Sequence, residues 1–217
     1  RHDCLLLLDT VTSLGGVPLY IDEWKVDLAY SCSQKGLSCP PGLGPFTMGP
    51  RAEAKMAARQ DKVPNWYLDV SLLNKYWGSD RVYHHTAPVN MNFGMREALR
   101  LLAEEGLDQS WARHRRNAEA LWSGLEALGL EMVVPEEHRL PTLTTVRIPD
   151  GVDGKAFSQH LLNTHGIEVG GGLGSFAGKI WRIGLMGYNS TPENVDRLLD
   201  LFKTELPSFK GSVAAAA

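Results

Sequence analysis

The sequence predicts an α/β protein, and two stretches of the chain carry this prediction. Residues 4–9 form an apolar run that ends in Asp9, which is typical of a strand buried on both faces of a parallel sheet. Beyond Gly106, apolar segments with strand and helix periodicity alternate, which indicates a compact α+β unit. The 217 residues, 43% of them hydrophobic, suffice for one large or two small domains.

The first half is predicted to contain three short strands and two helices. The helix over residues 90–105 has apolar side chains at a helical spacing and ends at Gly106, because glycine commonly terminates helices. The expected elements in this half are strands at 4–9, 26–30 and 44–49 and helices at 51–59 and 90–105.

The second half is predicted to alternate between helices and strands. Its last helix begins at Pro192, at a position where proline is favoured, and Thr191 caps it. The other expected elements are helices at 108–128 and 154–162 and strands at 130–134, 144–148, 167–169 and 179–185.

Composition argues against several classes of partner. The net charge of -3 gives no electrostatic reason to expect nucleic acid or an anionic membrane. The densest basic group, which begins at Arg113, is interpreted as the solvated face of a helix. No apolar run reaches the ~18–20 residues of a membrane span. Three cysteines are too few and too oddly numbered for a disulfide framework, and they fit a reducing compartment.

A metal site is not expected. The chain has no CxxC motif, and its seven histidines are not spaced as a ligand set. The tandem His84-His85 pair is the exception that could suggest one. Neighbouring residues on a strand point to opposite faces, however, and no third ligand is evident.

Lys35 lies in a context that could make it reactive. It follows a predicted strand, has small neighbours and precedes the rigid Pro40-Pro41-Gly42. A Schiff-base lysine needs partial desolvation, because burial disfavours the ammonium form and frees the amine. Asp9 ends another strand 26 positions earlier. It could cap a turn, or it could keep a pyridine nitrogen protonated. If the two strands are parallel neighbours, Asp9 and Lys35 share one edge of the sheet.

Four segments resemble a known family, in the family's order and over nearly the whole chain. They are Leu-Leu-Asp-Thr-Val-Thr-Ser-Leu-Gly-Gly at 7–16, Ser-Cys-Ser-Gln-Lys-Gly-Leu-Ser-Cys-Pro-Pro-Gly at 31–42, Tyr-His-His-Thr-Ala-Pro-Val at 83–89, and Gly-Gly-Leu-Gly at 171–174 followed by Gly-Lys-Ile-Trp-Arg-Ile-Gly at 178–184. They resemble the alanine–glyoxylate and serine–pyruvate group of class V aminotransferases. Those enzymes use pyridoxal 5'-phosphate (PLP) and have the PLP-dependent transferase fold type I.

The resemblance implies roles for four residues around the cofactor. Lys35 would form the Schiff base with PLP and move the α-proton of the substrate, and Asp9 would pair with the pyridine nitrogen. Val11 would pack against one face of the ring, and Gln34 would lie near the ring oxygen.

The resemblance also implies a homodimer with shared active sites. Tyr83 and Thr86 would reach across the dimer to the phosphate of the partner's cofactor, and hydroxyl groups donate well to phosphate oxygens. Arg182 would bind the substrate α-carboxylate with a bidentate fork. Because Trp181 and Ile183 flank it, Arg182 is expected to point opposite to them, into the cleft.

The expected reaction is ping-pong transamination from alanine or serine to glyoxylate or a similar small 2-oxo acid. A 3-hydroxykynurenine transaminase of the same family is the nearest alternative. A cysteine desulfurase is disfavoured, because Gln34 stands where those enzymes place a histidine, and Cys39 precedes two prolines. A third alternative is a catalytically incomplete fragment that acts only as an interaction chain.

The domain division follows from the resemblance and from the break at Gly106. Residues 1–105 would be the C-terminal part of the PLP-binding large domain, 106–208 the small α+β domain, and 209–217 a tail or linker. The chain begins with Arg1 and ends in four alanines, so we expect it to be the C-terminal portion of a longer protein. Relatives are often peroxisomal or mitochondrial, and no C-terminal peroxisomal signal of the Ser-Lys-Leu type is seen.

Overall fold

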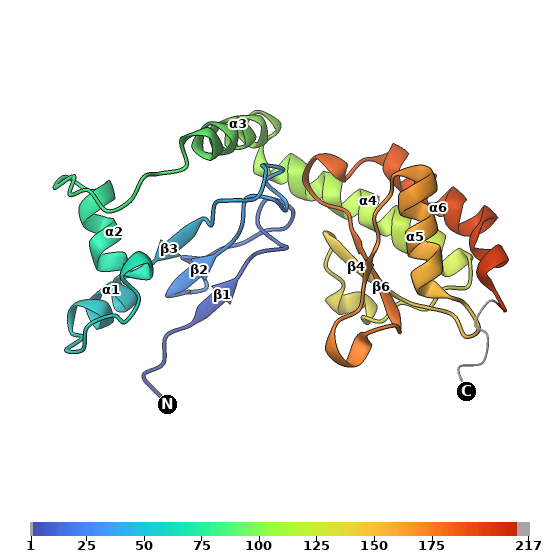
Figure 1. The fold of residues 1–217 in the computed structure, drawn as a ribbon, viewed down its shortest axis with the longest axis horizontal. Helices are drawn as coiled ribbons and strands as arrows, with labels where there is room; N and C mark the ends of the chain where they lie inside the picture. The colour runs from blue at the N-terminus through green and yellow to red at the C-terminus, as the bar shows by residue number, and fades with distance from the viewer. Residues whose placement is uncertain (1, 212–217) are drawn as a thin grey trace.

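The computed structural model describes residues 2–211 and contains two three-stranded sheets, one in each half of an elongated molecule (Figure 1). Helices α3 (Val89–Glu105) and α4 (Leu107–Ala127) join the two halves. Within the described range, no helix has the length and apolar character needed to cross a bilayer. The four C-terminal alanines of the predicted tail lie outside the described residues.

The first sheet brings the carboxyl ends of two parallel strands to one edge. Strand β1 (Leu7–Asp9) pairs in parallel with β2 (Leu28–Tyr30), and Asp9 stands opposite Tyr30. Strand β3 (Phe46–Met48) pairs antiparallel to β2. The parallel pairing confirms the arrangement expected for the Asp9 and Lys35 segments.

The predicted burial of the first strand on both faces is wrong in this structure. The side chains of Leu6 and Leu7 are 50% and 56% exposed, because no described segment covers them. The strand itself is also shorter than predicted and begins only at Leu7.

Two helices follow the first sheet and lie at the end of the molecule away from the second sheet (Figure 1). Helix α1 (Pro50–Ala57) begins with proline in its first turn, and α2 (Val70–Trp77) is capped by the Asp69 side chain, which accepts from Ser71 N. The short 3-10 turn η1 (Trp66–Leu68) precedes α2. The sequence analysis did not predict α2.

The junction of α3 and α4 falls at Gly106, as predicted. This residue has φ +83°, a left-handed conformation that glycine adopts without strain. Both helices match the predicted ranges to within one residue at each end. Near its beginning, α4 contacts the turn after β1, where Ser110 Oγ donates to Gly15 O at 2.7 Å.

The second sheet is antiparallel throughout, with strand order β4-β6-β5, and α4, α5 (Gly154–His165) and α6 (Pro192–Thr204) supply its packing partners. Its strands are β4 (Leu143–Arg147), β5 (Gly170–Gly171) and β6 (Ile180–Gly184). In β6, Trp181 and Ile183 enter the core beside Phe157 and Phe202. Each such large side chain stabilises the fold by roughly 1.5–3 kcal/mol when buried.

Two strands predicted in the second half are wrong. In residues 130–134, only Met132 forms an isolated bridge, with Val146. Residues 167–169 form no strand, and the pairing starts at Gly170, which stands opposite Arg182 of β6. The remaining 3-10 turns are η2 (Glu136–His138), η3 (Gly174–Phe176), η4 (Gly187–Asn189) and η5 (Leu206–Phe209). Phe209, expected in the tail, packs against the core.

Candidate active site

The carboxyl ends of β1 and β2 are tied together by side-chain and backbone hydrogen bonds. Thr10 donates to the carbonyl of Tyr30 from its backbone nitrogen (2.9 Å) and from its hydroxyl (2.7 Å). Ser31 Oγ donates to Thr10 O at 3.0 Å. Asp9 and the lysine loop (residues 31–39) therefore leave the sheet at the same edge.

Asp9 is held as a carboxylate. Its Oδ2 accepts from the Tyr30 hydroxyl at 2.6 Å, and its Oδ1 accepts from the backbone nitrogen of Val11 at 2.8 Å. The Tyr30 hydrogen bond, followed by the Val11 hydrogen bond, lowers the pKa of Asp9 below its usual value. The exposed Asp9 side chain is thus a negative charge at neutral pH, with lone pairs remaining for a cationic or N–H partner.

The lysine loop is fixed by its own hydrogen bonds and by close packing. Ser33 is fully buried, and its hydroxyl donates to Pro40 O at 2.7 Å. The Ser38 backbone nitrogen donates to Lys35 O at 2.9 Å. At Gly36, a Cβ atom would lie 2.2 Å from the carbonyl oxygen of Leu14, so the turn after β1 presses directly on this loop.

A cavity of about 460 Å³ opens at Lys35, which is half-buried. One wall is the lysine loop itself, including Gln34. The other comes from the Gly187 loop (residues 186–190), which follows β6 in the second half of the chain. This volume falls in the range of small-molecule sites. The cavity exists only because the two halves of the chain meet here.

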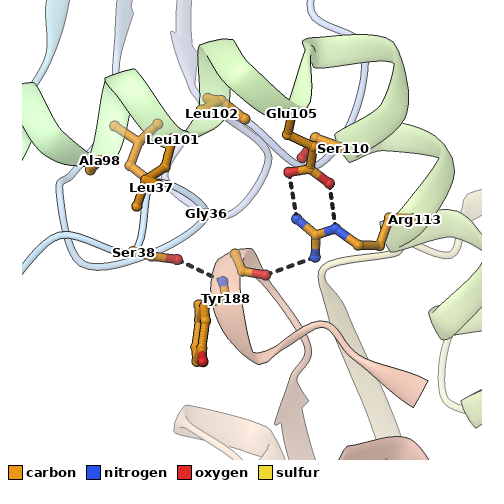
Figure 2. Close-up of a pocket in the computed structure, with 11 residues that line it drawn as sticks. Gly36, Leu37, Ser38, Ala98, Leu101, Leu102, Glu105, Ser110, Arg113 and Tyr188 are labelled. Carbon is orange, nitrogen blue, oxygen red and sulfur yellow. Dashed lines mark hydrogen bonds and ion pairs between the residues drawn. The ribbon is translucent and has the colours of Figure 1, made fainter. Parts of the chain in front are cut away.

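Arg113 anchors the Gly187 loop, as Figure 2 shows. Its guanidinium forms a two-point ion pair with Glu105, and its Nη1 donates to Gly187 O (2.9 Å) and Ser190 O (2.8 Å). The ion pair lowers the pKa of the Glu105 carboxyl. The interpretation of Arg113 as a solvated helix residue is therefore wrong, because four of its hydrogen bonds are made inside the protein.

His114 holds the same loop from a fully buried position. Its Nδ1 lies 2.7 Å from Ser110 O, and its Nε2 lies 2.8 Å from the backbone nitrogen of Gly187. Since that nitrogen can only donate, Nε2 accepts and Nδ1 carries the proton. Burial lowers the pKa of His114, which favours this neutral form. Sequence reasoning missed both Arg113 and His114.

Arg182 follows the predicted alternation but engages a backbone partner. Trp181 and Ile183 on either side are 1% and 5% exposed, whereas Arg182 is half-buried on the other face. Its Nε donates to Gly171 O at 2.7 Å. Arg182 is not among the residues that line the cavity at Lys35, and neither are Asp9 and Val11.

Tyr83 and Thr86 lie in the segment between α2 and α3, and neither lines the cavity. Both are exposed, Tyr83 to 72%, and their hydroxyl oxygens are 3.0 Å apart. Between them, His84 and His85 do not point to opposite faces as predicted. This segment is not a strand, and the two Nδ1 atoms lie 2.9 Å apart.

Comparison with solved structures shows which fold this is. The structure of an alanine–glyoxylate aminotransferase from Nostoc sp. matches with a TM-score of 0.88 and 65% identity, over 90% of this chain and 52% of that one. The ureidoglycine–glyoxylate aminotransferase of Bacillus subtilis matches with a TM-score of 0.92 and 39% identity, over 99% and 55%. These two structural matches confirm the predicted fold, which is that of the PLP-dependent class V aminotransferases.

Sequence comparison gives the same answer. The family model described as aminotransferase class-V matches residues 1–198. An alanine–glyoxylate aminotransferase from Callithrix jacchus is 46% identical over 210 residues, 95% of this chain and 51% of that protein. The chain belongs to the class V aminotransferase family. It spans about half the length of the curated relatives it matches.

Proposed function

We propose that the protein containing this chain is a PLP-dependent aminotransferase that moves the amino group of alanine or serine to glyoxylate or a similar small 2-oxo acid. The observation that carries the proposal is Lys35, half-buried beside a cavity and on the same sheet edge as an ionised Asp9. Glyoxylate stands in the names of both the Nostoc and the Bacillus relatives, whereas their amino donors differ. The 3-hydroxykynurenine alternative is not favoured.

The residues present fit PLP. Lys35 would hold the cofactor covalently, and Asp9 would accept a hydrogen bond from the protonated ring nitrogen, for which its lowered pKa keeps it charged. Val11 would pack on one ring face and Gln34 would lie near the ring oxygen. When bound, PLP supplies an electron sink for the electrons released at the substrate α-carbon.

Lys35 would move the proton at the α-carbon of the substrate. This transfer requires a neutral amine held in position, and the loop that carries Lys35 is fixed on both sides. The Gly187 loop would keep water away from the reacting carbon by closing the second wall of the cavity. The reaction would follow a ping-pong order, in which the first product leaves before the second substrate binds.

Arg182 would bind the carboxylate of each substrate. Its Nε already donates to Gly171 O, which orients the side chain and leaves the terminal nitrogen atoms to form the fork. Tyr83 and Thr86 would serve the phosphate of the partner subunit's cofactor in a homodimer with shared sites. Their exposure and their position away from the chain's own cavity support this role.

The proposal is tested on the full-length protein. Adding PLP should produce the visible absorption band of a lysine-bound cofactor, and pyruvate should form from alanine and glyoxylate in a coupled assay. Lys35→Ala should abolish both signals, whereas Lys62→Ala, at an exposed lysine, should retain them. A wild-type protein without the band contradicts the cofactor proposal. A band together with turnover of 3-hydroxykynurenine but not of alanine or serine contradicts the substrate proposal.

The carboxylate clamp is tested separately. Arg182→Lys should raise KM for alanine by about 10–100-fold, because lysine cannot reproduce a bidentate contact. The exposed Arg147→Lys is the matched control, since Arg147 is on the neighbouring strand and pairs with Glu131 at the surface. An unchanged KM in Arg182→Lys would remove Arg182 from the substrate site.

A further inference from the structure

A group of metal-ligating side chains lies in the second half of the chain. His160 and His165 come from α5, and Glu205 is the residue that ends α6. His165 Nε2 lies 2.8 Å from Glu205 Oε1, and His160 Nε2 contacts Glu205 Oε2. All three ligand atoms are within 4.8 Å of one another. Within residues 2–211, this is the only group of three or more such residues that converges in this way.

The surroundings of this triad restrict its three side chains. They are only 23–33% exposed, so the group is partly shielded from solvent. Thr164 Oγ1 lies 3.2 Å from His160 Nδ1, which is a partner that can fix the tautomer of that ring. Arg197 donates to His165 O at 2.7 Å and fixes the end of α5 against α6.

We propose that His160, His165 and Glu205 bind a divalent transition-metal ion, with Zn²⁺ as the best fit, through two imidazole Nε2 atoms and one carboxylate oxygen. The fourth position would hold water. Two imidazoles and a carboxylate form a ligand set that suits Zn²⁺, whereas Mg²⁺ and Ca²⁺ prefer oxygen ligands. With Zn–N and Zn–O bonds of ~2.0–2.2 Å, the ligand atoms of a tetrahedral ion are ~3.3 Å apart, so small side-chain rotations suffice.

The side chains keep the same number of protons when the ion binds. In the metal-free triad, Nε2 of each imidazole carries the proton that the Glu205 carboxylate accepts. Metal binding needs the Nε2 lone pair, so this proton leaves to solvent while solvent returns one to Nδ1, and the ring stays neutral; in His160 the Nδ1 proton then faces Thr164 Oγ1. Glu205 enters as a carboxylate, whose two oxygens face the two imidazoles in the metal-free triad. No redox step or additional reactant is involved.

The triad is separate from the cavity at Lys35, because none of its residues lines that cavity. It joins the last turn of α5 to the end of α6, two elements of the unit around the second sheet. The bound ion would therefore stabilise this unit rather than take part in transamination. Since an ion that binds only the folded state raises stability, the thermal midpoint should depend on metal concentration.

The test uses untagged full-length protein treated with a chelator and titrated calorimetrically with ZnCl₂. We expect Zn²⁺ to bind with a micromolar or lower Kd. A free Zn²⁺ concentration 100-fold above Kd stabilises the folded state by about 2.7 kcal/mol, which should raise Tm of the full-length protein by roughly 3 °C. His165→Gln and Glu205→Gln should each weaken binding at least ~10-fold, while His138→Gln, at an exposed histidine of η2, should not.

Co²⁺ spectra show which residues bind even if a variant loses stability. Four-coordinate Co²⁺ should give strong visible bands without the thiolate charge transfer that Cys4, Cys32 or Cys39 would produce. Absence of Zn²⁺ binding in the wild type overturns the proposal. Zn²⁺ binding that persists in both His165→Gln and Glu205→Gln would also overturn it. Zn²⁺ binding that disappears in a double variant of His84 and His85 would assign the ion to those residues and overturn it as well.

Discussion

Replacing His114 by leucine should destabilise the chain through a single buried hydrogen-bond donor. Leucine fills a similar space but has no acceptor, so the N–H of buried Gly187 loses its partner at 2.8 Å. The carbonyl of Ser110 remains satisfied, because it lies within α4 and accepts the helical hydrogen bond. An orphaned buried donor costs roughly 1–3 kcal/mol, and we expect His114→Leu to lose that amount at pH 7.5.

This loss should shrink in acid. Burial lowers the pKa of folded His114 below its ordinary value of 6.5, so the unfolded chain binds more protons in this range. The stability that His114 contributes is therefore complete above pH ~6.5, and it falls by up to about 1.4 kcal/mol per pH unit as the pH drops below it. Leucine binds no proton, so wild type and variant should converge between pH 6.5 and pH 5.5.

Urea unfolding at pH 7.5, 6.5 and 5.5, with a chelator present, measures both effects. The difference between wild type and variant at each pH cancels the other titrating groups. His138→Leu, at an exposed histidine, should differ from wild type by no more than ~0.5 kcal/mol at every pH. A His114→Leu penalty below ~0.5 kcal/mol at pH 7.5, or one that grows in acid, would refute this reasoning.

Two other substitutions test contacts around the same site by urea unfolding. Gly36→Ala should lower the free energy of unfolding by about 1–3 kcal/mol, because its Cβ would lie 2.2 Å from the backbone oxygen of Leu14. Gly44→Ala is the control and should be nearly neutral, because its Cβ meets only an ordinary 3.6 Å contact. Equal losses in the two variants would contradict the packing argument. Arg113→Gln should cost about 1.5–3 kcal/mol, because a carboxylate and two carbonyls lose their donor. The exposed Arg115→Gln removes an i,i+4 ion pair with Glu119 and a cation–π contact with Trp122, and it should lower the free energy of unfolding by about 1 kcal/mol or less. A larger loss there than at Arg113 would count against the anchor.

Features decided by neighbours in the chain were predictable. The last helix begins at Pro192 with Thr191 as its cap, and Thr191 Oγ1 accepts from Asn194 N as expected. Gly106 separates two helices because it adopts a positive φ, which glycine tolerates without strain. The shared edge of Asp9 and Lys35 was predictable as well, because it follows from the rule that parallel strands end on the same side.

Features that depend on residues far apart in the sequence were not predictable. His114 Nε2 accepts a hydrogen bond from Gly187 N, 73 positions away in the sequence, and His165 contacts Glu205, 40 positions away. No local sequence pattern predicts either contact. The second sheet shows the same limit. Apolar periodicity favoured a strand at 167–169, but pairing with β6 begins at Gly170, where the residue type alone disfavours a strand.

Helix α4 does not line the cavity at Lys35, but it positions the Gly187 loop, which does. Gly187 has φ +60°, and a Cβ there would lie 2.0 Å from the Ser38 side-chain oxygen Oγ and 3.0 Å from the backbone oxygen of Gly36, so the Gly187 backbone packs directly against the lysine loop. Tyr188 N donates to that same Ser38 Oγ at 2.7 Å, while Arg113 and His114 of α4 hold the loop from behind. The wall facing Lys35 is thus positioned by α4. Because Arg113 and His114 both hold this one loop, the stability lost in the double variant should differ from the sum of the losses in the two single variants. The double variant should also have an altered substrate affinity, although neither side chain lines the cavity at Lys35.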